Sequence, residues 1–157
     1  MKKSSTVFLQ VIIALIGTGV FVFMLWEPHL EGRNAHATVF EVYFKDPFLA
    51  YMYVGSTPFF VALYRAFRLF GQVRQSGAFS QRSVDDLRVI RRCALALIGF
   101  VAAGLGFIML SGDNEDRPAG EFMSLLVILP SSVIALAAGR SALKLQNALS
   151  GSGVGRG

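Results

Sequence analysis

The sequence is poor in the residues from which most metal and redox centres are built. Its 157 residues include one cysteine and two histidines, and only 16% are charged. The lone Cys93 excludes an intrachain disulfide, and there is no Cys/His ligand framework. His29 and His36 with Glu27 and Glu31 match no metal-ligand motif well, which favours a solvated loop. We therefore predict no metal site and no cofactor.

Asp, Glu, His, Lys and Arg are also missing from four apolar segments, residues 7–26, 48–64, 93–111 and 122–139. Proton-coupled transport and acid-base catalysis inside a membrane need such groups. Cys93 has no histidine on its side of the membrane to activate it as a nucleophile. We predict no catalytic residue and no enzyme activity.

What the sequence has in quantity is hydrophobic residues, at 54%, with a mean hydropathy of +0.54. A helix of about 20 residues crosses a hydrocarbon core of about 30 Å. We predict an all-α integral membrane protein, an antiparallel four-helix bundle forming one domain over residues 1–149. The expected spans are about 7–26, 48–70, 93–111 and 122–143, and the Gly- and Ser-rich tail 150–157 should be disordered. A signal peptide cleaved near residue 37 is the alternative for the first segment.

The basic residues indicate how the spans are oriented. Most of them fall at the two ends of the chain and between the second and third segments, on what would be one side of the membrane. They are Lys2, Lys3, Arg65, Arg68, Arg74, Arg82, Arg88, Arg91, Arg92, Arg140, Lys144 and Arg156. The positive-inside rule then places both termini in the cytoplasm. Orientation accounts for the net charge of +5 without direct nucleic-acid binding, and Arg88, Arg91 and Arg92 are expected to face anionic membrane lipids.

The strongest local pattern is in the polar connection between the second and third segments, residues 71–92, which we call the elbow. Ser80 is a candidate N-cap, and Ser83 to Asp86 forms a second, nested capping pattern. Either start predicts a short amphipathic helix that leads directly into the third span.

One face of the elbow helix is expected to contact lipid and the other a partner protein. Val84, Leu87 and Ile90 form the predicted lipid-facing row. Arg82 with Asp86 and Asp85 with Arg88 have the spacing of helical neighbours. The predicted contact surface consists of Phe79, Ser80, Arg82, Asp86 and Arg88.

Small residues predict where the spans pack closely. The third segment offers Ala96, Gly99, Ala103 and Gly106, and the fourth offers Ser131, Ala135, Ala138 and Ala142. A homo-oligomer formed through the Gly99 and Ala103 face is the alternative to packing within one bundle.

Two spans carry an internal proline at similar depth, Pro58 and Pro130, and both are expected to kink their helices. Freed carbonyl groups beside hydroxyl side chains could instead form a ligand or transport site.

Several motifs resemble one bacterial family. They are Thr57-Pro58-Phe59-Phe60, Ala62-Leu63-Tyr64, Ala78-Phe79-Ser80, Ser83-Val84, Leu87, Ile90 and Cys93-Ala94. The sequence is similar to the membrane proteins filed as domain of unknown function 2975. That resemblance implies four transmembrane helices in a bacterial cytoplasmic (inner) membrane, no assigned activity, and genes often found beside small helix-turn-helix regulators. The charged tail typical of the family is replaced here by Gly and Ser after Leu149.

We interpret the chain as a regulatory or sensory membrane scaffold. Its elbow would be presented to a cytosolic protein, such as a small helix-turn-helix regulator. The alternative is a small-solute or lipid transporter or channel component that uses the proline-containing second and fourth spans.

Overall fold

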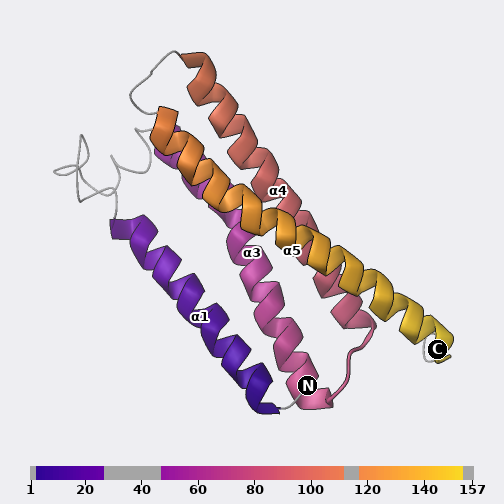
Figure 1. Ribbon diagram of the computed structural model, residues 1–157. Helices are drawn as coiled ribbons and strands as arrows, with labels where there is room; N and C mark the ends of the chain where they lie inside the picture. The colour runs from indigo at the N-terminus through magenta and orange to yellow at the C-terminus, as the bar shows by residue number, and fades with distance from the viewer. Residues whose placement is uncertain (1–2, 27–46, 112–116, 154–157) are drawn as a thin grey trace.

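The computed structural model describes residues 3–26, 47–111 and 117–153, which form four long helices (Figure 1). These are α1 (Lys3–Trp26), α3 (Pro47–Ser76), α4 (Gln81–Ser111) and α5 (Arg117–Gly151). Consecutive helices run antiparallel, and the packed pairs are α1 with α3, α3 with α4, and α4 with α5. No strand occurs in the described ranges. The predicted all-α bundle is confirmed.

Three of the helices, α1, α4 and α5, are long and apolar enough to cross a membrane. Helix α3 is of similar length, but tyrosines lower its hydropathy. Two of their hydroxyl groups donate to backbone carbonyls of neighbouring helices, Tyr51 to Phe100 at 2.5 Å and Tyr53 to Met24. Since buried polar groups are tolerated in an apolar environment when they are paired, these tyrosines are compatible with a membrane-embedded α3.

The helices extend further than the sequence indicated. Helix α3 begins at Pro47, a favoured first position for proline, and continues to Ser76. The elbow helix and the third span are one helix, as expected, which begins at Gln81. Helix α5 begins at Arg117, inside the expected loop, and ends at Gly151, inside the expected disordered tail. The candidate loop and cleavage site in residues 27–46 lie outside the described ranges.

Contacts between α1 and α3 occur in antiparallel order along the two helices, and we call this series of contacts the ladder. The Phe21 and Phe60 rings pack edge to face at 6.0 Å. A Cβ added at Gly17 would lie 3.3 Å from Leu63. At the other end of the ladder, Gln10 Nε2 donates to the Phe67 carbonyl at 3.1 Å. The buried side chains of α1 are the polar Thr6 and Gln10, so the deepest burial of α1 is near its N-terminal end.

The same end of the molecule contains most of the tightly packed residues. Figure 1 shows the N-terminal end of α1, the α3–α4 turn and the C-terminal end of α5 there; we call it the basic end because the predicted cytoplasmic cations of the described ranges gather toward it. Its buried apolar side chains are Leu69, Val73, Val84, Ile90, Ala94, Ala135, Ala138 and Ala142.

Small residues predicted the packing face of α5 but not that of α4. On α5, Ser131, Ala135, Ala138 and Ala142 are buried, which confirms that face. On α4, Ala96, Gly99 and Ala103 are exposed, so that prediction was wrong. Helix α4 instead approaches α3 through ring contacts: Tyr51 lies against Gly104, and Phe100 lies against Gly55.

Candidate functional site

The elbow consists of the last residues of α3, a tight turn and the first turns of α4. Helix α3 stops at Gly77, which has a left-handed backbone (φ 69°) and whose amide donates to the Val73 carbonyl at 2.9 Å. Ser80 occupies the N-cap position of α4, as predicted. The side-chain bond of this cap runs from the Ser80 amide to Ser83 Oγ at 3.2 Å, the reciprocal half of a capping box.

A buried ion pair joins α4 to α3 directly behind this turn. Asp86 is fully buried, and its Oδ1 accepts from Arg65 Nη1 at 2.9 Å. Arg68 Nε lies 3.5 Å from Oδ2, close enough for an ionic contact but without hydrogen-bond geometry. Two arginines of α3 therefore neutralise the buried carboxylate of α4.

This position corrects the prediction that Asp86 belongs to the exposed contact surface. Asp86 precedes Ile90 by four residues, and Ile90 precedes Ala94 by four. Residues at that spacing share a helix face, and here the face is the buried one. The expected pair of Arg82 with Asp86 is therefore replaced by the pairs to α3, whereas Arg88 and Asp85 do pair, at 3.6 Å.

The predicted lipid-facing row also packs inside the protein. Val84 is fully buried and Ile90 is 7% exposed, while Leu87 is half-buried. Helix α4 packs against both α3 and α5, and Val84 and Ile90 are buried within the protein.

The other four predicted contact residues remain on the surface. Phe79 is 41% exposed, and Ser80, Arg82 and Arg88 are exposed as well. We call these four residues the elbow surface. Arg88 is also fixed to α5, because its Nη2 donates to Gln146 Oε1 at 2.5 Å. The elbow surface thus combines an exposed aromatic ring with two cations.

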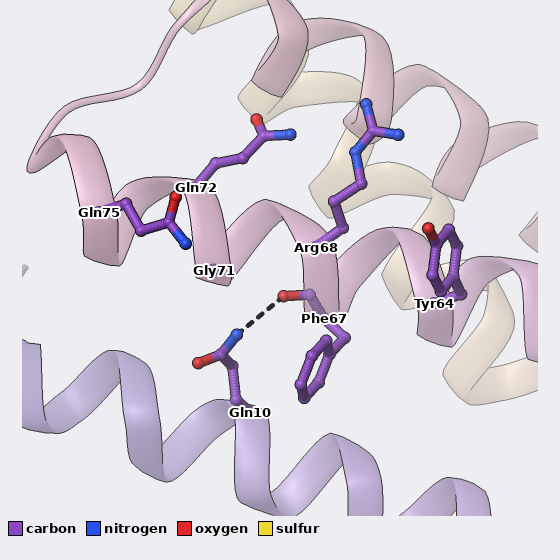
Figure 2. A pocket seen from close by; sticks show the side chains of 7 residues that line it. All are labelled: Gln10, Tyr64, Phe67, Arg68, Gly71, Gln72 and Gln75. Carbon is purple, nitrogen blue, oxygen red and sulfur yellow. Dashed lines mark hydrogen bonds between the residues drawn. The ribbon is translucent and has the colours of Figure 1, made fainter.

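A groove of about 360 Å³, which the sequence did not reveal, lies along α3 beside α1 and has both polar and apolar lining. Figure 2 shows Gln10 pointing from α1 toward the backbone of α3. The groove is lined by Gln10, Tyr64, Phe67, Arg68, Gly71, Gln72 and Gln75. The sequence feature that could have indicated this groove is Gln10, because a side-chain amide within an apolar span needs a hydrogen-bond partner.

The two prolines do not form a shared site in the described structure. Pro58 is half-buried on α3 and Pro130 is exposed on α5, and these helices are not a packed pair. Nearby hydroxyl groups donate to carbonyls of their own helix, Ser56 to Tyr53 and Ser132 to Ile128, each at 2.7 Å.

Comparison with known proteins now places the chain. The family model described as "Protein of unknown function (DUF2975)" matches residues 31–149, three quarters of the sequence. The chain belongs to the DUF2975 family. One relative is the uncharacterized membrane protein YoaS of Bacillus subtilis (strain 168), 33% identical over 137 residues, which cover 87% of this chain and 86% of that protein. No solved structure matches.

The DUF2975 match covers α3, the elbow, α4 and α5 up to Leu149, so the candidate site lies inside the family region. The family description names no activity. Within the described ranges of this DUF2975 protein, no three His, Cys, Asp or Glu side chains gather as a metal site. Cys93 is free and half-buried.

Proposed function

We propose that the protein is a regulatory or sensory scaffold of the bacterial cytoplasmic membrane, which presents the elbow surface to a cytosolic protein. The observation that carries this proposal is the buried Asp86, paired with Arg65 at 2.9 Å. The pair fixes the start of α4 against α3, so the short turn between the helices has little freedom. A surface fixed in this way loses less conformational entropy when a partner binds.

The chemistry of the elbow surface suits a protein partner. Aromatic and arginine side chains dominate the binding energy of many protein interfaces. Phe79 supplies an exposed ring next to Arg82 in the same turn, and Arg88 lies two turns along α4. The excess of Lys and Arg at the basic end supports a cytosolic location for this surface.

The transport alternative has weaker support. It requires the regions of Pro58 and Pro130 to open to one pathway, whereas Pro130 is exposed on the outside of α5. Serine hydroxyls bond to carbonyls near both prolines, which reduces the number of free polar groups available to a solute.

Photo-crosslinking in cells tests the proposal. A photoreactive amino acid at Phe79 or Arg82 should capture a cytosolic protein, with a helix-turn-helix regulator encoded nearby as the first candidate. A matched probe at Leu136, an α5 residue 63% exposed within the apolar span, should capture only lipid.

Two further variants make the test specific. Alanine at Arg82 and Arg88 should reduce capture by the Phe79 probe if the cations contact the partner. If probes at Phe79 and Arg82 capture only lipid or this protein, and alanine at Pro58 and Pro130 abolishes a solute flux, the transporter replaces the scaffold.

A further inference from the structure

A second cluster of cations on α4 shares Arg88 with the elbow surface and continues toward the apolar part of the helix. Arg88, Arg91, Arg92 and Leu95 line an open cavity of about 330 Å³, which we call the arginine cavity. A volume near 300 Å³ is at the lower end of the range for small-ligand sites. Three of its four lining residues are permanent cations, so the cavity suits an anion.

Among the described residues, a carboxylate pairs with only one of the three cavity cations, Arg88. The described ranges contain Asp85, Asp86 and Glu121 as their acidic residues. Asp86 is paired with α3, Asp85 reaches Arg88, and Glu121 is at the opposite end of the bundle. In the described part of the chain, Arg91 and Arg92 have no carboxylate partner. Their charge is available to an external anion.

Packing against α5 holds Arg91 in position. Gly139 of α5 is buried, and a Cβ added there would lie 3.2 Å from Arg91 Cδ and 3.3 Å from Nε. Because Gly139 has no side chain, the aliphatic part of Arg91 can pack directly against α5. Arg88 is fixed as well, by Gln146 on α5 and by Asp85. Arg88 and Arg91 are thus partly oriented before any ligand binds.

The position of Leu95 favours a lipid over a free anion as the ligand of the arginine cavity. It is 51% exposed and lies about one turn beyond Arg91 and Arg92, toward the apolar part of α4. Along the helix axis the cavity therefore runs from cationic to apolar. A phospholipid has the same order, with its phosphate at the membrane surface and its acyl chains below.

We propose that the arginine cavity binds the phosphate of an anionic phospholipid, with Arg91 and Arg92 as the main phosphate ligands. Leu95 contacts the first part of an acyl chain. Arg88, held by its protein partners, contributes its positive charge. The site shares Arg88 with the elbow surface, but its main ligands, Arg91 and Arg92, lie outside that surface, so lipid binding does not depend on a cytosolic partner.

Native mass spectrometry of the full chain in detergent tests this site, with phosphatidylglycerol and phosphatidylcholine of identical acyl chains as probes. Phosphatidylglycerol should bind more tightly than phosphatidylcholine. Arg91→Gln with Arg92→Gln should weaken phosphatidylglycerol binding about 25-fold, at about five-fold per charge near a membrane surface. Arg74→Gln with Lys144→Gln removes two exposed charges outside the cavity and is the matched control.

A second pair of variants tests the position of Arg91 without changing any charge. Gly139→Ala displaces the Arg91 stem, whereas Gly99→Ala on α4 enters open space. Both changes favour helix formation, so a folding defect is not expected. Weaker phosphatidylglycerol binding in Gly139→Ala alone supports the site.

The proposal is overturned by any of three results. Equal losses in the cavity and control double variants would indicate diffuse attraction to charge. Equal behaviour of Gly139→Ala and Gly99→Ala would show that the orientation of Arg91 does not matter. Displacement of phosphatidylglycerol by an equal concentration of inorganic phosphate would identify a free-anion site instead of a lipid site.

Discussion

Replacing Asp86 by asparagine tests the ion pair that joins α3 to α4. The substitution keeps the shape of the side chain and removes its charge. Removing one partner of a fully buried ion pair costs about 3–5 kcal/mol, mainly because the other charge is left buried. Here Arg65 and Arg68 retain 32% and 41% exposure and can turn toward water. We therefore expect a smaller loss, about 2 kcal/mol, typical of a hydrogen bond to a charged group.

The neighbouring Asp85 provides a matched control. Its side chain is 60% exposed and lies 3.6 Å from Arg88. An exposed pair at helical spacing contributes less than about 0.5 kcal/mol. Asp85→Asn therefore makes the same chemical change one position earlier, with little effect on stability.

Cys93 offers a convenient assay because it is the only cysteine in the sequence and is half-buried on α4, about two turns after Asp86. A thiol-reactive dye will label it as α4 separates from its neighbours during an SDS titration in mixed micelles. Asp86→Asn should shift the midpoint to lower SDS, and Asp85→Asn should not.

A double-mutant cycle with Arg65→Gln separates the pair from other effects of each change. Groups in direct contact usually couple by about 0.5–3 kcal/mol. A coupling near zero, or equal stabilities for Asp86→Asn and Asp85→Asn, would refute the view that this pair stabilises the elbow.

Three further predictions follow from other parts of the structure. Ser83→Ala removes the capping hydrogen bond and should lower the stability of the start of α4 by about 1 kcal/mol, measured as faster hydrogen exchange at Val84. Ser80→Ala keeps that bond, because the donor is the Ser80 backbone amide, and should lower the stability less. Equal exchange rates in these two variants would contradict the cap. Gln10→Leu should weaken α1–α3 packing by about 1 kcal/mol, seen as reduced crosslinking between the helices, whereas the exposed Val11→Leu should have no effect. Reporter fusions after Ser76 and after Asn114 should give a cytoplasmic and an external signal, respectively. An external signal at Ser76 would show that the predicted orientation is wrong.

The sequence predicted the four long helices because uninterrupted apolar segments leave few alternatives, and three of these helices are long and apolar enough to cross a membrane. It also predicted the N-cap position at Ser80, which depends on neighbouring residues alone. Its failures concern which side of a helix is buried. In α4, small residues occur on more than one face, so Ala96 and Gly99 were indistinguishable from true packing positions.

Asp86 shows the same difficulty more sharply. A charged residue near a membrane surface is expected to face water, and only the arginines of α3 make burial of this carboxylate favourable. Those partners are about 20 residues away in the sequence, and local periodicity carries no information about them. Gln10 was missed for a similar reason, because its acceptor is a backbone carbonyl, which every residue has.

The ladder between α1 and α3 determines the order in which contacts between these helices can form during synthesis. During synthesis α1 is made before its packing partner α3, and residues 27–46 separate the two helices. The contacts nearest that connection, from Met24 to Tyr53, are available first, and Gln10 meets Phe67 last. The Gln10 hydrogen bond therefore cannot form until the chain has been synthesised as far as Phe67, about two thirds of the way along α3.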